Sequence, residues 1–318
     1  MKVLANDGIS PEGVESLKNG GFEVSTTNVP QDQLIDHINA EGVNALLVRS
    51  ATTVRKDLID ACPSLKLIGR GGVGMDNIDV DYARSKGIHV INTPAASSQS
   101  VAELVFGSLF SLSRTTFDSY QKMPQSGVSE FKALKKKYAK GQELRGKTLG
   151  IVGFGRIGQS LASYALGAGM KVKAVDLFVD SADIRIPLHD QHVSVNVQVN
   201  KDLNEIIGEL DYISLHVPKQ ADGSAVIGKD ELSKMKDGVV LANAARGGVI
   251  DEDALIEALN SGKVRAAALD VFENEPTPRE DLLKHDKIAS TPHIGAATTE
   301  AQTRIGLELA SQIKELLK

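Results

Sequence analysis

A glycine-rich turn in the middle of the sequence has the spacing that binds a dinucleotide. Gly153, Gly155 and Gly158 form G-x-G-x-x-G directly after an apolar run that ends at Val152. The first glycine permits a tight turn, the second lets the backbone approach a pyrophosphate, and the third lets a helix pack closely. Asp176 lies about twenty residues on, where a carboxylate can bind ribose hydroxyls. The sequence therefore predicts a dinucleotide-binding strand–turn–helix unit.

Three further polar residues, Arg246, Glu275 and His293, follow apolar runs in the second half of the chain. Each alone has a structural interpretation, as a surface charge, a loop acid or a helix cap. Their neighbours favour a ligand instead: two glycines after Arg246 let the backbone approach a bound group. A proline after Glu275 and another before His293 stiffen their loops.

Alternating strands and helices must position these residues. In the first part we expect strands at 3–5, 22–24, 45–48, 65–68 and 89–91, and helices at 11–17, 31–38 and 56–61. This repeated pattern predicts a parallel, doubly wound α/β sheet. Ligands bind beyond the carboxyl ends of such strands. Arg49-Ser50 and the segment from Arg70 to Gly74 lie at two of these ends.

A second α/β region follows an apolar helix over 101–112. Beyond the glycine turn we expect strands at 172–176, 212–217, 239–242, 266–269 and 288–289, and helices at 161–167, 203–207 and 251–259. Within an irregular segment at 181–199, the alternation over 193–199 indicates an edge strand. A last helix, from about Thr298, has an apolar stripe that must pack on something, and we infer that it returns to the first region. The predicted domains are 1–97 with 291–318, and 98–290.

Composition sets limits on the class of protein. The chain has 318 residues, 42% hydrophobic and 24% charged, as in ordinary globular proteins of about two domains. A net charge of −5 argues against a broad nucleic-acid surface. No apolar run is long enough to span a membrane, and the short N-terminal run is not a signal peptide. The single cysteine, Cys62, suits a reducing compartment. We therefore expect a cytoplasmic protein without nucleic-acid or membrane partners.

The motifs together resemble those of the D-isomer-specific 2-hydroxyacid dehydrogenases, in family order and over nearly the whole chain. Besides the glycine turn, the matching segments are Val48–Thr52, Gly69–Asp79, Asn92–Pro94, Val101–Leu104, Leu215–Pro218, Asn243–Gly248, Ala268–Phe272 with Glu275-Pro276, and Thr291–Gly295. The resemblance implies a Rossmann-type NAD-binding domain, a flavodoxin-like substrate domain and a cleft between them.

In that family the residues matching Arg246, Glu275 and His293 are catalytic. Oxidation of a secondary alcohol moves a hydride to the nicotinamide and a proton to a base. Histidine suits the base because its free pKa lies near neutrality. A carboxylate such as that of Glu275 can orient the imidazole. The guanidinium of Arg246 can hold the substrate carboxylate and polarise the C2 oxygen.

The resemblance also implies a set of cofactor contacts and no metal. They are Gly153, Gly155, Arg156, Ile157 and Gly158 in the glycine turn, Asp176 on the ribose, and Val101, His216, Val217, Pro218, Ala244, Arg246, Asp270, His293 and Gly295 elsewhere. Asp176 is followed by Leu177 and Phe178, with no adjacent arginine for a 2′-phosphate. This favours NAD over NADP.

Within the family, Arg49 and Arg70 match positions that bind the substrate phosphate in the phosphoglycerate dehydrogenases. Two guanidinium groups at neighbouring strand ends suit a dianion; the alternative is a pair of surface salt bridges. Ser50, Val73, Gly74, Arg246 and His293 complete the expected substrate contacts. The family often has a Trp-Arg pair near the basic stretch Lys135–Lys137, but this chain has no tryptophan, and we interpret the stretch as a solvated face.

The resemblance thus implies NAD-dependent oxidation of 3-phospho-D-glycerate, a step in serine biosynthesis. One alternative is a glyoxylate or hydroxypyruvate reductase, whose substrates lack the phosphate. Another is a dinucleotide-sensing corepressor of the same family, which keeps the same catalytic triad. The apolar helix over 101–112 suggests a homodimer or a higher homo-oligomer, although a helix buried in the core has the same pattern.

Overall fold

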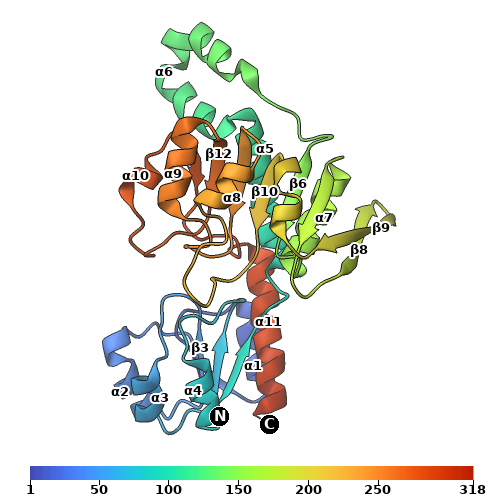
Figure 1. The fold of residues 1–318 in the computed structure, drawn as a ribbon. Coiled ribbons are helices and arrows are strands. Elements are labelled where there is room, and N and C mark those ends of the chain that lie inside the picture. The colour runs from blue at the N-terminus through green and yellow to red at the C-terminus, as the bar shows by residue number, and fades with distance from the viewer. Residues whose placement is uncertain (318) are drawn as a thin grey trace. The chain divides into compact units, whose positions relative to one another are not determined.

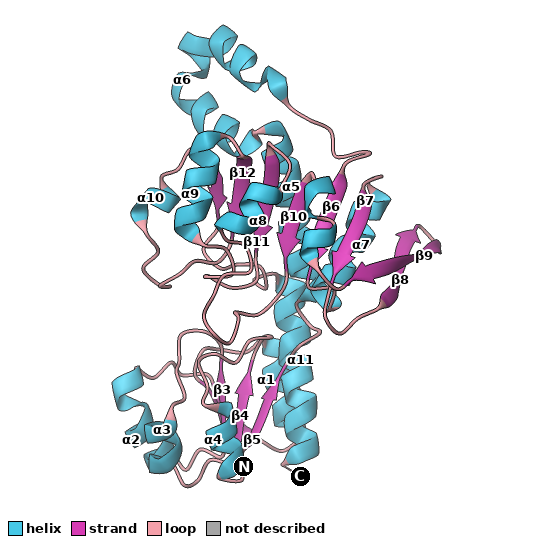
Figure 2. Cartoon of the chain, viewed as in Figure 1, coloured by secondary structure: helices cyan, strands magenta, loops and turns pink. Residues whose placement is uncertain are grey.

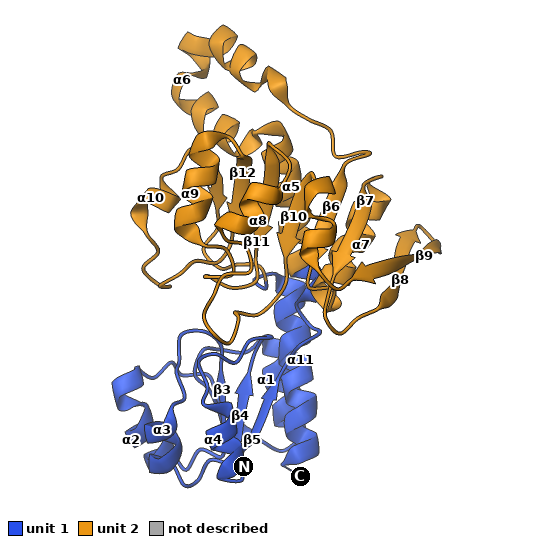
Figure 3. Ribbon diagram, viewed as in Figure 1, with its two compact units in different colours: residues 1–100, 296–318 blue, residues 101–295 orange. Residues whose placement is uncertain are grey.

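The computed structural model describes residues 1–317 and divides the chain into two compact units (Figure 3). Unit 1 consists of Met1–Ser100 and Ala296–Lys318, and unit 2 of Val101–Gly295. The chain leaves unit 1 within helix α5 (Ser98–Arg114) and returns to it just before helix α11 (Thr299–Leu316). Each unit has its own mainly parallel sheet, which confirms the predicted α/β class.

Unit 1 is built on a five-stranded parallel sheet in the order β2-β1-β3-β4-β5 (Figure 1). The strands are β1 (Lys2–Ala5), β2 (Glu23–Ser25), β3 (Ala45–Val48), β4 (Leu67–Arg70) and β5 (His89–Asn92). Its helices besides α11 are α1 (Pro11–Asn19), η1 (Gln31–Gln33), α2 (Leu34–Glu41), α3 (Lys56–Ala61) and α4 (Val80–Ser85). This strand order is the flavodoxin-like one.

Helix α11 completes the core of unit 1. The Thr298 hydroxyl caps the helix by accepting from the N–H of Ala301 at 3.1 Å. The predicted apolar stripe is buried, and Ile305, Leu309 and Ile313 share a core cluster with residues of β1, β3 and β4. The last segment of the chain is thus packed against strands formed by the first.

Unit 2 is built on an eight-stranded sheet in the order β13-β12-β11-β10-β6-β7-β9-β8. The strands are β6 (Thr148–Val152), β7 (Lys171–Val175), β8 (Ser181–Leu188), β9 (Gln191–Asn200), β10 (Tyr212–Leu215), β11 (Val239–Asn243), β12 (Val264–Leu269) and β13 (Ile288–Ser290). Its helices besides α5 are α6 (Thr116–Lys137), η2 (Tyr138–Lys140), α7 (Arg156–Gly167), η3 (Leu203–Glu205), η4 (Ile207–Glu209), α8 (Lys229–Lys234), α9 (Glu252–Ser261) and α10 (Glu280–Leu283). From β9 across to β12 the sheet follows the Rossmann order, whose direction reverses between β6 and β10.

The strand predicted at 193–199 is present within β9, but the predictions that 181–199 is irregular and that this strand lies at the edge were wrong. Strands β8 and β9 form an antiparallel hairpin, and β9 also pairs with β7, so β8 is the edge strand. Buried Ile184 and Val197 lie in the same core cluster as residues of α7. Strand β8 contains Pro187 and two charged residues, which lower its intrinsic strand propensity. Pairing with β9 stabilises the strand in spite of this low propensity.

Helix α6 was not predicted either. Figure 2 shows it standing away from the sheet of unit 2. Leu134 is its buried residue among those the structure describes, and Pro124 and Gly127 within the helix weaken the helical signal of its sequence. Its two ends are joined because Asp118 binds both Lys137 and the hydroxyl of Tyr138. Lys135–Lys137 are exposed, as a solvated face requires.

Cys62 ends helix α3 and is 1% exposed. Burial raises the pKa of its thiol to about 11, as expected for a structural cysteine. Within residues 1–317, every helix is too short or too polar to cross a bilayer.

Candidate active site

The glycine turn after β6 has the geometry that a pyrophosphate needs. Gly153 has φ +92°, and a Cβ there would lie 2.6 Å from the carbonyl oxygen of His216. A Cβ on Gly158 would lie 2.3 Å from the carbonyl oxygen of Gly153. At Gly155 a Cβ would have no neighbour within 4 Å. Two glycines are therefore required by the packing of the protein, whereas Gly155 leaves room for a ligand beside the unpaired N–H groups of Arg156 and Ile157 that begin α7.

Asp176 is fixed at the edge of this turn. Its Oδ2 accepts from the N–H of Phe154 at 2.7 Å, and its Oδ1 accepts from Phe178 at 2.8 Å and Val179 at 3.1 Å. A carboxylate has about four acceptor positions, so capacity remains for a ribose hydroxyl. The adjacent Leu177 and Phe178 are exposed. These residues fit a dinucleotide without a 2′-phosphate.

His293 and Glu275 form a hydrogen-bonded pair. The His293 Nδ1 lies 2.8 Å from Oε2 of Glu275, and Oε1 of Glu275 accepts from the N–H of Phe272 at 2.9 Å. A neutral imidazole that donates from Nδ1 to the carboxylate has Nε2 available to accept a proton. The pair therefore has the arrangement of a general base and its orienting acid.

Asp270, at the end of β12, holds the loop that carries His293. It is 4% exposed and accepts from the hydroxyl of Thr291 at 2.6 Å and from the N–H groups of Ile294 and Gly295, both at 2.8 Å. The bonds lie on both sides of His293, whose φ is +53°. The sequence placed Asp270 near the cofactor by resemblance alone; its three bonds to this loop were not predicted.

Arg246 lies in the turn after β11. Its Nη1 donates to the carbonyl of Ala245 at 2.6 Å, and the side-chain amide of Asn243 donates to the Arg246 carbonyl at 2.9 Å. A Cβ on Gly247 would lie 1.8 Å from the carbonyl oxygen of Phe272. The turn of Arg246 therefore touches the segment that leads to Glu275.

The remaining predicted cofactor residues lie at neighbouring strand ends of unit 2. His216, Val217 and Pro218 follow β10, and Ala244 follows β11. His216 is half-buried, and desolvation of its ring lowers its pKa to about 4, so the ring is neutral near pH 7. Its Nε2 lies 2.8 Å from the hydroxyl of Ser214. A Cβ on Gly295 would lie 3.3 Å from the Val101 side chain, which brings Val101, Asp270 and Gly295 together.

In unit 1 the predicted substrate residues lie at neighbouring strand ends. Arg70 ends β4 and pairs with Val48 of β3, which directly precedes Arg49 and Ser50. The Arg70 Nη1 donates to the carbonyl of Gly71 at 3.1 Å and lies over Gly72. Asn92 donates to the carbonyl of Val73 at 2.7 Å, which anchors the loop of Val73 and Gly74.

Two residues that the sequence analysis missed support the Arg49 loop. Asp7 accepts from the N–H groups of Arg49 at 2.6 Å and Thr52 at 3.1 Å, and also from the Thr52 hydroxyl. Asn77 donates to the carbonyls of the same two residues. The signal available in the sequence was that Asp7 follows the first strand closely, at a strand end like that of Arg49.

Comparison with known proteins identifies the family. Residues 106–295 match the family model described as "D-isomer specific 2-hydroxyacid dehydrogenase, NAD binding domain". A hydroxypyruvate reductase of Thermotoga maritima is 45% identical over 99% of this chain and 98% of its own length. A D-3-phosphoglycerate dehydrogenase of Methanocaldococcus jannaschii is 40% identical over 100% of this chain, which spans only 58% of that protein.

Solved structures agree with these sequence matches. The TT0316 protein of Thermus thermophilus has a TM-score of 0.85 at 29% identity, covering 100% of this chain and 97% of that one. A D-lactate dehydrogenase of Aquifex aeolicus, crystallised with NAD and lactic acid, has a TM-score of 0.75 at 30% identity, covering 100% and 95%. The chain belongs to the D-isomer-specific 2-hydroxyacid dehydrogenases, and its unit 2 contains their NAD-binding domain.

Proposed function

We propose that the protein oxidises 3-phospho-D-glycerate to 3-phosphohydroxypyruvate, a step in serine biosynthesis. The observation that carries this proposal is the pair of arginines, Arg49 and Arg70, at the ends of the neighbouring strands β3 and β4. Two guanidinium groups suit a phosphate dianion, and an unphosphorylated hydroxy acid has no such group for them to bind. Relatives named D-3-phosphoglycerate dehydrogenase, at 38–40% identity, support the same substrate.

In the proposed reaction His293 accepts the proton of the C2 hydroxyl at Nε2. Glu275 keeps the imidazole oriented and stabilises its protonated form. Arg246 binds the substrate carboxylate and polarises the C2 oxygen, with further N–H donors from Val73 and Gly74. The turn from Gly153 to Gly158 would hold the pyrophosphate of NAD and Asp176 its ribose, and the bound nicotinamide would supply the acceptor for the C2 hydride.

Reduction of hydroxypyruvate is the second candidate function. A specific observation favours it: the Thermotoga maritima relative of that name matches this chain over almost the full length of both proteins. In that case Arg49 and Arg70 would have a structural role, and the physiological direction would be reduction.

One assay discriminates these functions. NAD reduction is measured with 3-phosphoglycerate, glycerate and D-lactate, and NADH oxidation with hydroxypyruvate and glyoxylate. The proposal expects the largest kcat/KM for 3-phosphoglycerate. A larger value for hydroxypyruvate or glyoxylate supports the second candidate. NADH binding without turnover of any of the five would indicate a dinucleotide sensor.

We also propose that the protein forms a homodimer through unit 2. Phe110 on α5 is 48% exposed and packs edge-to-face on Phe106 at a centroid distance of 5.0 Å. Helix α6 exposes Tyr120, Met123, Val128 and Phe131. Such apolar surfaces are typical of protein interfaces. Sedimentation at micromolar concentration tests the proposal, and a single species near 33.9 kDa contradicts it.

A further inference from the structure

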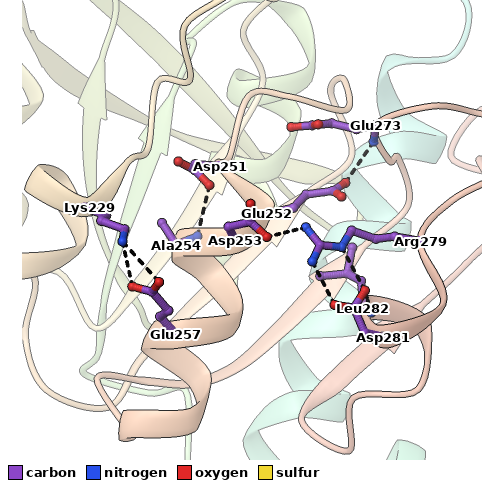
Figure 4. A network of polar contacts seen from close by, with 10 residues as sticks. All are labelled: Lys229, Asp251, Glu252, Asp253, Ala254, Glu257, Glu273, Arg279, Asp281 and Leu282. Atoms are coloured by element: carbon purple, nitrogen blue, oxygen red, sulfur yellow. Dashed lines mark hydrogen bonds and ion pairs between the residues drawn. The ribbon is translucent and has the colours of Figure 1, made fainter.

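Glu252, the first residue of α9, is a buried acid outside the residues described so far. It is 7% exposed, and its Oε1 accepts from the N–H of Glu273 at 2.8 Å (Figure 4). Burial raises the pKa of this carboxyl group, while the bond from Glu273 opposes the rise. Burying a carboxylate is costly unless it is hydrogen-bonded. We therefore ask what the hydrogen bond of the buried Glu252 carboxylate does for the structure around it.

The segment that Glu252 holds is the one that carries Glu275. Glu273 lies two residues before Glu275, and the preceding N–H, that of Phe272, donates to the Glu275 carboxylate. Two successive backbone N–H groups are thus each bound by a glutamate. The other oxygen of Glu275 binds Nδ1 of His293. Glu252 therefore fixes the backbone immediately beside the hydrogen-bonded pair without touching His293.

A second link joins the same helix to the far end of this segment. Arg279 binds Asp253 at 2.6 Å and also Asp281 (Figure 4). Asp253 is 77% exposed in its side chain, and exposed ion pairs stabilise little. Of the two attachments, the buried one at Glu252 is the one expected to restrain Glu275.

We propose that Glu252 is a positioning residue for the Glu275–His293 pair. By accepting from the N–H of Glu273 it holds Glu275 where its carboxylate orients the imidazole. The inference rests on the proposed roles of Glu275 and His293. Proton transfer depends steeply on such alignment, since a displacement of about 1 Å can cost about 10²-fold in rate.

Substitutions at position 252 separate the hydrogen bond from the charge. Glu252→Ala removes the acceptor, whereas Glu252→Gln keeps an oxygen that can accept from Glu273. Glu257→Ala is the matched control, because Glu257 lies on the same helix and pairs only with exposed Lys229 among the described contacts (Figure 4). We measure kcat and KM with the hydroxy acid that turns over fastest, and the Kd of NADH by fluorescence.

We expect Glu252→Ala to lower kcat by about 10- to 100-fold, with KM and the NADH Kd within about twofold. Glu252→Gln is expected to stay within about threefold of wild type, and Glu257→Ala to match it. If Glu252→Ala does not fold, Glu252→Met replaces it, because methionine keeps the length and lacks the acceptor. An unchanged kcat in the Ala or Met variant, or equal losses in the Gln variant, overturns the proposal.

A double-mutant cycle with Glu275→Ala completes the test. If Glu252 acts through Glu275, adding Glu252→Ala to Glu275→Ala costs no further activity. A full further loss in that background shows a separate structural role and overturns the inference. A Glu275→Ala variant with wild-type kcat, or a wild type without any turnover, instead refutes the proposed function on which the inference rests.

Discussion

The two units hold their candidate site residues in different ways. In unit 2 a hydrogen bond ends on the candidate side chain itself, because Glu275 binds the ring of His293. Asp270 binds the side chain of Thr291 and the backbone N–H groups of Ile294 and Gly295 on either side of that histidine. In unit 1 the bonds of Asp7 and Asn77 to the Arg49 residue end on its main chain. Within residues 1–317, no hydrogen bond is found on the Arg49 guanidinium itself.

This difference matches the demands of the chemistry. Proton and hydride transfer need groups fixed to a fraction of an ångström, and in the proposed function these groups belong to unit 2. Binding a charged substituent tolerates a long guanidinium on a fixed backbone, which is the role proposed for Arg49 in unit 1. Relatives and structural neighbours named for hydroxypyruvate, phosphoglycerate and lactate share the fold. We infer that unit 2 determines the reaction and unit 1 selects the substrate.

The largest effect is expected in unit 2. Replacing His293 with alanine should lower kcat by roughly 10²–10⁴-fold for every substrate, because no base remains to accept the proton. NADH binding should change little, since the glycine turn and Asp176 are untouched. Stopped-flow turnover and NADH fluorescence titration measure the two quantities. Comparable losses in both would mean that His293 is structural.

In unit 1 the expected effect is smaller and selective. Arg49→Ala and Arg70→Ala should each raise the KM for 3-phosphoglycerate at least about tenfold, roughly 1.4 kcal/mol of binding. Oxidation of an unphosphorylated hydroxy acid should barely change. Lysine should be a poor replacement, because a point charge cannot make paired contacts. Losses of equal size for both substrate types would refute the proposal that Arg49 and Arg70 bind a phosphate. They would also refute the inference that unit 1 selects the substrate.

A cofactor prediction concerns unit 2 alone. Asp176→Ala should weaken NAD binding about fivefold, because it removes one hydrogen bond that contributes about 1 kcal/mol. Discrimination against NADP should relax at the same time, because a carboxylate repels a 2′-phosphate. The ratio of kcat/KM values for NAD and NADP reports the change, with Asp176→Asn as the control that keeps an acceptor. A constant ratio would place the ribose contact elsewhere.

The smallest effect sharpens the contrast between main-chain and side-chain support. Asp7→Ala removes the acceptor for the N–H groups of Arg49 and Thr52. We expect the KM for 3-phosphoglycerate to rise about threefold and kcat to stay unchanged. This loss of binding is smaller than the contribution of one hydrogen bond to a charged group. Steady-state kinetics with both substrates provides the measurement. A fall in kcat would show that unit 1 also takes part in the reaction itself.

Local patterns in the sequence were enough to predict much of the fold. The strand–turn–helix at Gly153 and the helices that begin near Asp251 and Thr298 depend on a few neighbouring residues, and the structure has all three. The parallel sheet of unit 1 follows from β-α alternation, whereas its flavodoxin-like order was implied by the resemblance alone. The predicted class needed no long-range information.

The missed features depend on contacts between distant residues. Strand β8 is ordered by pairing with β9, and the two ends of α6, which contains Pro124, are joined by Asp118 and Lys137. Glu252 and Glu273 are 21 positions apart, and Asp7 lies 42 positions from Arg49. No local pattern marks an acid as a partner for a particular backbone N–H. The family motifs named the candidate site residues, and the residues that support them were not predicted.

The split composition of unit 1 has a consequence for how the protein comes off the ribosome. Strands β1 to β5 emerge before unit 2, but Ile305, Leu309 and Ile313, which belong to the same core, emerge after it. All of Val101–Gly295 is synthesised in between, and that continuous segment can acquire its tertiary structure while unit 1 still lacks α11. The entropy cost of bringing α11 back to the first sheet grows only slowly with the length of the intervening chain. Until α11 has been synthesised, however, the face of the first sheet that α11 covers stays open to chaperones and to other nascent chains.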